Sequence, residues 1–243
     1  MSPTSQPRPQ GATLIVTRSG VPVSVHRSTR ARRLTLRVDP ITGDARLSVP
    51  TSAPAATVRD FLDRHTGWIA DRQASQQQRI AFAPDAIVPI EGVPHRIDFR
   101  NGRGHPVTED GLRLLVTGPD RGSVSRRVTD YLKARARTRI TVIAEQKVRH
   151  LPASARPLIG ITLKDTKSRW GSCSSAGRLN FSWRLIMAPT SVIDYVVAHE
   201  VAHLAEMNHG PRFWHLCKAL TAGDMDASKT WLKREGPNLH RYG

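Results

Sequence analysis

The chain has 243 residues, of which 39% are hydrophobic, so it is long enough to bury a core in one large or two small domains. Lysine and arginine outnumber aspartate and glutamate by 37 to 20, and the charge of +17 makes DNA or another polyanion a candidate partner for the basic surface. Two distant cysteines exclude a disulfide framework, and without a signal peptide or a membrane-spanning apolar run we expect a cytoplasmic protein with no membrane partner.

The N-terminal part is expected to be rich in antiparallel β-structure. Residues 1–12 are rich in Pro, Ser and Gln, which predicts a flexible tail. Over 13–50, "RRLTLRV" and "ARLSVP" alternate apolar and polar residues around the turn-like "DPITGD", which predicts a hairpin. Helical spacing over 55–73 predicts a helix on that sheet, and further short strands are expected over 86–117. No internal repeat is evident, and we assign one β-rich domain to 13–120.

The C-terminal part, 121–243, is expected to be a second domain, which makes the whole chain an α+β protein. The segment 123–150 predicts a basic helix with one apolar stripe, "LIGITLKD" predicts a strand, and "SRWGSCSSAGRLNFSWRLI" predicts a hairpin. A helix then begins with Thr190 or Ser191 as its N-cap and continues through "VIDYVVAHEVAHLAEM" to a break at "NHGP". The apolar stripe consists of Val124, Val128, Leu132, Ala136, Ile140 and Ile143.

The stretch "HEVAH" has the spacing of a metal site. On a helix, His199 and His203 lie one turn apart on one face, so their imidazoles could share a zinc ion. Glu200 projects to the neighbouring flank, where its carboxylate could reach a water on the metal. A chance HExxH is expected only about 0.01 times in a chain of this composition. Burying these groups without a partner would be costly, so the pattern predicts a Zn²⁺ cofactor.

The third zinc ligand is a choice between two residues. His209 follows the predicted helix break, so the turning chain could bring its imidazole back toward the metal, and we favour it. Glu206 is the alternative. It lies on the same predicted helical stripe, one turn beyond the pair, which suits a carboxylate that holds an imidazole better than one that binds the ion.

Several motifs, in the same order along the chain, resemble a known family. These are "RSTRARRLTLRVDP", "FLDRHTGWI", "SRWGSCSS", "LNFSWRLIMAP" and "VVAHEVAHLAEMNHGPRFW". Together they are similar to the YgjP-like metallopeptidases, cytosolic bacterial zinc hydrolases often grouped with SprT-like proteases, over roughly Val21 to Trp214. The resemblance implies a zincin-like catalytic domain with an HExxH active-site helix. The site residues that it implies are three zinc ligands, His199, His203 and His209, and the catalytic acid/base Glu200.

The predicted hairpin supplies further candidate residues. It could present an edge strand to an extended peptide, or its aromatic residues could simply cover the active-site helix. Phe213 and Trp214 are interpreted as core residues and Cys173 as structural. Four residues are candidate substrate or oxyanion contacts: Arg169, Trp170, Ser172 and Asn180.

The leading functional prediction is a zinc-dependent metallopeptidase that hydrolyses a protein or peptide substrate. Three protein ligands leave a position for a water whose pKa falls to about 7, and Glu200 would act as its general base. The alternatives are a zinc hydrolase of a non-peptide amide, a DNA-associated protease, and a zinc-stabilised nucleic-acid-binding module. The last would need a fourth protein ligand, for which no Cys pair is positioned.

Overall fold

The chain has a mixed α+β fold that divides into two compact units, Met1–Gln78 and Arg79–Gly243. The predicted tail lies outside the described residues except for its last position, where the first strand begins. The computed structural model describes residues 12–18, 20–39, 42–74 and 78–243.

The first unit contains a four-stranded sheet. The predicted hairpin is confirmed, because β3 pairs with β4 in the antiparallel sense. The sequence predicts an antiparallel sheet, which is wrong for one pair of strands. Strand β4 lies between β3 and β2, and it runs parallel to β2. The strands, in the spatial order β1-β2-β4-β3, are β1 (Ala12–Val16), β2 (Pro22–Ser28), β3 (Thr35–Val38) and β4 (Ala45–Pro50).

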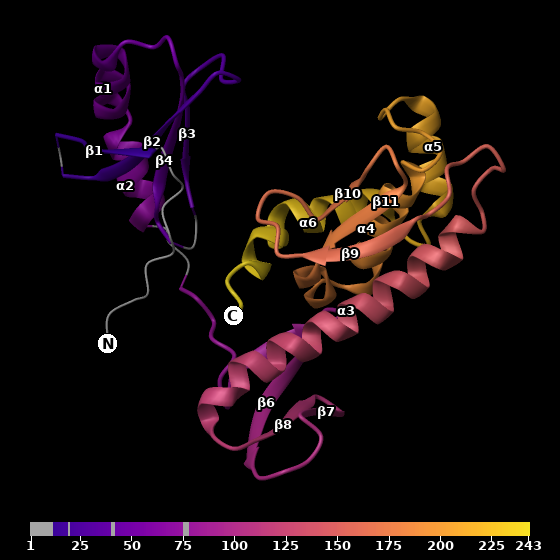
Figure 1. The fold of residues 1–243 in the computed structure, drawn as a ribbon. Coiled ribbons are helices and arrows are strands. Elements are labelled where there is room, and N and C mark those ends of the chain that lie inside the picture. The colour runs from indigo at the N-terminus through magenta and orange to yellow at the C-terminus, as the bar shows by residue number, and fades with distance from the viewer. Residues whose placement is uncertain (1–11, 19, 40–41, 75–77) are drawn as a thin grey trace. The chain divides into compact units, whose positions relative to one another are not determined.

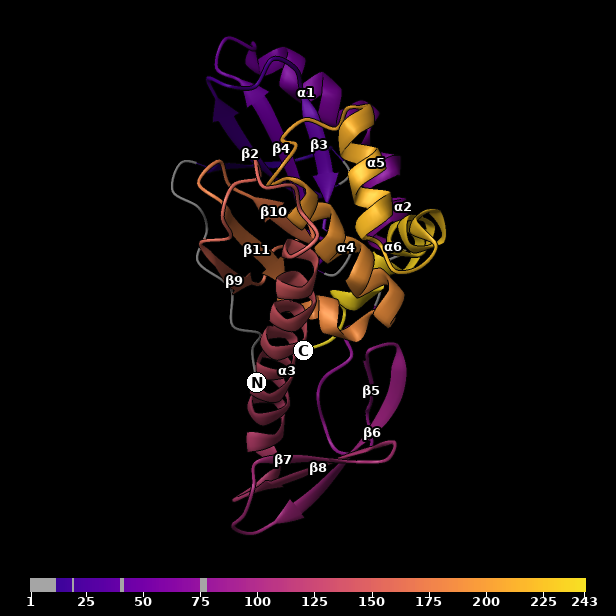
Figure 2. The ribbon, with the colours of Figure 1, turned by 90° about the vertical axis from the view of Figure 1, so that its right-hand side faces the viewer.

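Two helices, α1 (Ala55–Arg64) and α2 (Thr66–Ala74), replace the single helix predicted over 55–73. The chain leaves the helical conformation at His65, where φ is −103° and ψ is 8°. Side chains of both helices share one buried cluster with the strands, so the helices cover the same face of the sheet (Figure 2). That cluster includes Val58, Leu62 and Ile69 from the helices and Val23, Val25 and Leu47 from the strands.

The second unit begins with a sheet that repeats the topology of the first, an internal repeat that the sequence analysis missed. Both sheets consist of two antiparallel hairpins joined by a central parallel pair. Gly20 and Gly92 each precede a Val-Pro pair and each have φ of +84°. When the two glycines are aligned, Ile97 takes the position of Val25. Its register partner Leu114 then takes the position of Leu47, and all four residues are buried. The strands, in the order β5-β6-β8-β7, are β5 (Ile87–Ile90), β6 (Val93–Asn101), β7 (Val107–Asp110) and β8 (Arg113–Gly118).

A short 3-10 helix, η1 (Arg121–Ser123), leads into the long helix α3 (Val124–Val148). Figure 1 shows α3 running from the sheet of β6, β7 and β8 to the sheet of β9, β10 and β11. All six residues of its predicted apolar stripe are buried. Because α3 packs on β7 and β8, the strands β5 to β8 belong with the C-terminal half of the chain. The two compact units therefore divide at 78/79, whereas the sequence predicts a boundary at 120/121.

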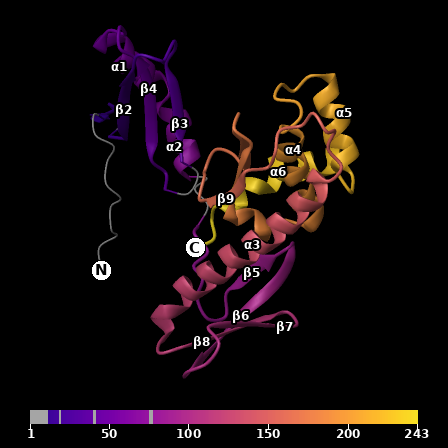
Figure 3. The same ribbon diagram turned by 45° about the vertical axis from the view of Figure 1, so that its right-hand side comes forward.

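The remaining elements include α4, whose C-terminal end carries the motif "HEVAH". The second sheet of this unit has the order β10-β11-β9, and the predicted hairpin is confirmed as β10 and β11. Figure 3 shows α4 close to α3, α5 and α6, and α4 packs against all three. These elements are β9 (Gly160–Lys164), β10 (Gly171–Cys173), β11 (Arg178–Ser182), the 3-10 helix η2 (Trp183–Met187), α4 (Thr190–Ala202), α5 (Pro211–Leu220) and α6 (Met225–Leu239).

Both predicted ends of α4 differ from the structure. Pro189 is the N-cap, without a side-chain hydrogen bond, so neither Thr190 nor Ser191 caps the helix. The helix ends at Ala202, with His203 as its C-cap, and does not continue to Met207. An ion pair of 2.6 Å between Lys147 and Asp194 ties α4 to α3. In the described parts of the chain, no helix has the length and apolar character needed to cross a bilayer.

Candidate metal centre

Helix α4 places two of the three predicted ligands on one side, close to its C-terminal end. The ring centroids of His199 and His203 lie 5.0 Å apart. The Nδ1 of His203 lies 3.1 Å from the main-chain oxygen of Glu206. Because a carbonyl oxygen only accepts, Nδ1 must carry the proton in this hydrogen bond, which leaves the lone pair of Nε2 free for a metal.

The turn after α4 brings His209 to the same point. Its Nε2 lies 3.1 Å from the Nε2 of His199, and one ligand nitrogen from each of the three histidines lies within 4.8 Å of the others. His203 is buried, His199 is partly buried and His209 is exposed. The structure therefore brings together all three histidines that the sequence singled out.

The three imidazoles fit a zinc ion. Two nitrogens bound to one tetrahedral zinc at about 2.05 Å would lie about 3.3 Å apart, close to the 3.1 Å between His199 and His209. Burial and the neighbouring histidines lower the pKa of His199 to about 4, and burial lowers the pKa of His203. Both rings are therefore neutral at pH 7, the state that metal ligation requires.

Two aromatic residues of α5 support the histidine cluster. Phe213 is fully buried, as predicted, and its ring centroid lies 4.9, 4.5 and 4.6 Å from those of His199, His203 and His209. Trp214 was predicted to be core but is only partly buried. Its ring stacks on His209 at 5.6 Å, so it orients the most exposed of the three imidazoles.

Arginine 156, which the sequence analysis did not single out, holds the end of α4. Its guanidinium donates to the main-chain oxygens of His203 and Leu204. These carbonyls lie at the helix end, where no further helical turn supplies donors for them. Because α4 ends here, the predicted helical stripe does not reach Glu206. Glu206 supports the site through its main-chain oxygen, which accepts from His203. Its carboxylate does not belong to the metal-ligand cluster.

Glu200 is buried beside the histidines, with 6% of its surface exposed. Burial raises the pKa of Glu200 to about 7, and the positive charge of Arg169 opposes this shift. A carboxyl group that titrates near neutral pH can both accept and release a proton under working conditions. The environment thus suits the general acid/base role predicted for this residue.

Gly171 on β10 makes room for the Glu200 side chain, a requirement that the sequence analysis missed. A Cβ atom at position 171 would lie 2.5 Å from Cγ and 2.6 Å from Oε1 of Glu200. Only glycine lacks this atom, so only glycine allows β10 to approach α4 so closely.

We expect Gly171→Ala to displace the Glu200 carboxyl group and to lower the hydrolytic activity predicted from the sequence about 100-fold, because small misplacements of catalytic groups are costly. Overpacking should also lower the free energy of unfolding by about 1–3 kcal/mol, while zinc content stays unchanged. The matched control is Gly223→Ala, whose added Cβ would meet no atom closer than 4.0 Å. Equal activities for the two variants would contradict the prediction.

The pKa of Glu200 also predicts a pH dependence of stability in the metal-free protein. A carboxyl group whose pKa rises from 4.5 to about 7 on folding stabilises the fold below pH 4.5, and this contribution is lost as the pH rises to about 7. Glu200→Gln removes the titration, so the variant should gain about 3 kcal/mol relative to wild type between about pH 4 and pH 8. Urea unfolding with a chelator present measures this difference in the free energy of unfolding. A difference that stays the same at every pH would refute the prediction.

The four predicted contact residues have different surroundings. Arg169 is exposed near Glu200. Trp170 stacks on His240 with ring centroids 5.0 Å apart, so it packs against the C-terminal end of the chain. Ser172 and Asn180 face each other across the hairpin, and the Asn180 amide donates to the Ser172 hydroxyl at 3.4 Å.

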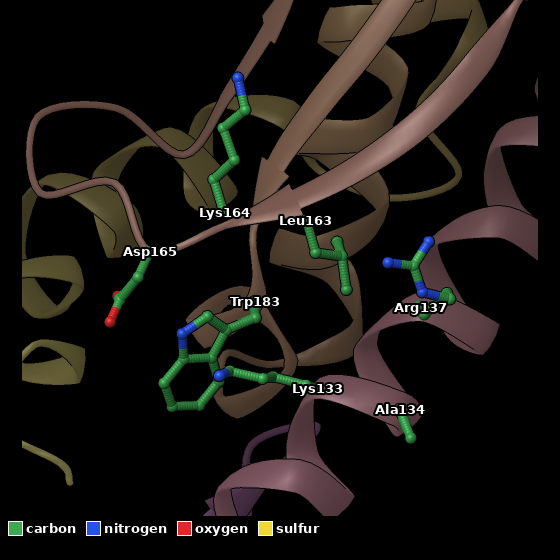
Figure 4. A pocket seen from close by; sticks show the side chains of 7 residues that line it. All are labelled: Lys133, Ala134, Arg137, Leu163, Lys164, Asp165 and Trp183. Atoms are coloured by element: carbon green, nitrogen blue, oxygen red, sulfur yellow. The ribbon is translucent and has the colours of Figure 1, made fainter.

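Two further features of this unit are Cys173 on β10 and a pocket beside α3. Burial raises the pKa of the Cys173 thiol, which favours the predicted structural role. A pocket of about 280 Å³ lies between α3, β9 and η2, and it contains none of the predicted site residues (Figure 4). The ammonium group of Lys133 lies 6.0 Å from the Trp183 ring centroid in this pocket, and Asp165 is paired with Arg184 at 2.7 Å.

One comparison with known proteins gives a match. The family model described as "YgjP-like, metallopeptidase domain" matches residues 32–235, which include the histidine cluster and Glu200. Comparison with curated proteins and with solved structures yields no match.

Proposed function

The chain belongs to the YgjP-like metallopeptidase family, and from this premise we propose that it is a zinc-dependent peptidase with Glu200 as its catalytic acid/base. The observation that carries the proposal is the meeting of three imidazole nitrogens within 4.8 Å beside a buried carboxyl group. The Nε2 atoms of His199 and His209 face each other at 3.1 Å, the separation expected of two donors to one zinc ion.

In this proposal the residues have separate tasks. His199, His203 and His209 would hold the ion, and Phe213 and the Glu206 carbonyl keep the rings in place. When bound, zinc supplies Lewis acidity, lowering the pKa of water to about 7 and polarising the substrate carbonyl. The Glu200 carboxylate would take the proton of the attacking water and return it to the departing amine nitrogen as the C–N bond breaks.

Strand β10 is the proposed docking edge for the substrate. Among the strands of the described residues it pairs with β11 alone, and it packs against α4, which carries His199 and has His203 as its C-cap. An extended peptide could add to this edge through main-chain hydrogen bonds. The exposed Arg169 lies two residues before the start of this strand and would lie beside such a peptide.

Metal removal and restoration on a peptide library test the proposal. Purified protein should contain about one zinc per chain, lose cleavage activity with a chelator, and regain it when zinc is added. Cleavage of small amides but not of peptides would replace the peptidase proposal with a different amide hydrolase. Cleavage that persists without metal would refute the zinc mechanism.

A further inference from the structure

The strand layer of the first unit carries a positive charge that its helical layer does not share. Helices α1 and α2 are balanced, with three arginines and three aspartates: Arg59, Arg64 and Arg72 against Asp60, Asp63 and Asp71. The strands and connections over residues 12–54 contain seven arginines and two aspartates. The arginines are Arg18, Arg27, Arg30, Arg32, Arg33, Arg37 and Arg46.

Two of these arginines face each other on the side of the sheet opposite the helices. Arg37 on β3 is the register partner of Arg46 on β4, and both are exposed. Arg46 stands between the buried residues Ala45 and Leu47, so its side chain points away from the helix-covered core. Like charges directly opposite each other destabilise a sheet. The exposed His26 on β2 belongs to the same open face.

The internal repeat shows that the fold does not require this arrangement. Arg46 corresponds to Arg113 in the second unit, Arg37 corresponds to Asp110, and His26 corresponds to Asp98. There Arg113 is the register partner of Asp110, and its Nη1 lies 3.5 Å from Asp98 Oδ2. The second sheet therefore surrounds its arginine with carboxylates at the positions where the first sheet has an arginine and a histidine.

The connection between β2 and β3 adds three further arginines next to this sheet. Arg30, Arg32 and Arg33 are exposed, and in the described part of the chain none of them forms an ion pair with a carboxylate. Arg46 has one carboxylate nearby, that of Asp44 at 3.9 Å, so the five arginines still outnumber their partners. Guanidinium groups bind phosphate with two parallel hydrogen bonds, so an arginine cluster with this excess of charge matches a phosphodiester backbone. Residues 1–60 contain no Phe, Trp or Tyr, so this surface has no aromatic platform for unstacked bases.

We propose that this basic face binds the phosphate backbone of double-stranded nucleic acid without reading its sequence. The face consists of Arg30, Arg32, Arg33, Arg37 and Arg46. Phosphate groups between Arg37 and Arg46 would relieve the repulsion of the like-charged pair. The proposal goes beyond the peptidase function and does not depend on it, because every residue involved lies in the first unit.

Fluorescence anisotropy with a mixed-sequence DNA duplex of about 20 base pairs tests the proposal on the full chain, between about 50 and 200 mM salt. The double variant Arg37→Gln/Arg46→Gln should lose affinity about tenfold and reduce the slope of log K against log salt by about 1.8, which corresponds to two phosphate contacts. The matched control Arg59→Gln/Arg64→Gln makes the same charge change on the helical layer and should bind like wild type. Glu200→Gln should also bind like wild type, which separates this test from the peptidase test.

Four results would overturn the proposal. These are no binding by wild type at the lowest salt, equal losses in both double variants, tighter binding to single-stranded DNA of the same length, and equally tight binding to polyglutamate or to phosphatidylserine vesicles. The last result would assign the face to an acidic protein or a membrane surface. Thermal unfolding of the Arg37→Gln/Arg46→Gln variant should show no loss of stability, since a repulsive pair is removed.

Discussion

Glu200→Gln is expected to lower kcat about 1,000-fold while leaving the zinc content of the protein unchanged. Glutamine has the shape of the protonated carboxyl group but cannot accept the proton of the attacking water. Because Glu200 belongs to the buried surroundings of the histidines but not to the ligand cluster, its replacement should preserve both the fold and the metal site. Metal analysis and steady-state kinetics on the same protein sample measure the two effects.

The control for this prediction is Glu206→Gln. Glu206 is only partly buried and acts on His203 through its main-chain oxygen, so its substitution should leave kcat close to that of wild type. If Glu200→Gln retained full turnover, the acid/base role would have to be given up. If the variant lost zinc as well as activity, Glu200 would be supporting the metal site instead of acting on substrate.

His209→Ala is expected to weaken zinc binding more than about 100-fold, a larger loss than is typical for residues that only orient a ligand. The structure places the Nε2 of His209 3.1 Å from that of His199, so the variant would remove one of three donors. Because His209 is exposed, its removal should leave the metal-free fold intact. Competition with a chromophoric zinc chelator measures the affinity.

Glu206→Ala discriminates between the two candidate third ligands. It removes the rival carboxylate but keeps the main-chain oxygen that accepts from His203 Nδ1. We therefore expect near-normal zinc affinity in this variant. A larger loss for Glu206→Ala than for His209→Ala would exchange the roles of the two residues.

Much of the fold was predictable where the pattern is local. The apolar stripe of α3 is buried as its period indicates, and alternation identified the β3–β4 hairpin. Two apolar segments that flank a turn containing glycine identified the β10–β11 hairpin. The internal repeat was missed because the two sheets share little more than the short stretches Gly-Val-Pro and Arg-Leu-x-Val. The boundary at 120 was misplaced because it depends on which helix the strands β7 and β8 pack against.

The sequence by itself determined the pairing of His199 with His203 and the adjacency of Glu200, since neighbours within one helical period are placed by the helix alone. Tertiary structure decided the rest of the site. The approach of His209, the carbonyl of Glu206, the space left by Gly171 and the Arg156 contacts all follow from where α4 ends and how β10 packs on it. Likewise, the sequence supplied the arginines, but only strand register set Arg37 opposite Arg46, because pairing between strands depends on contacts distant in the chain.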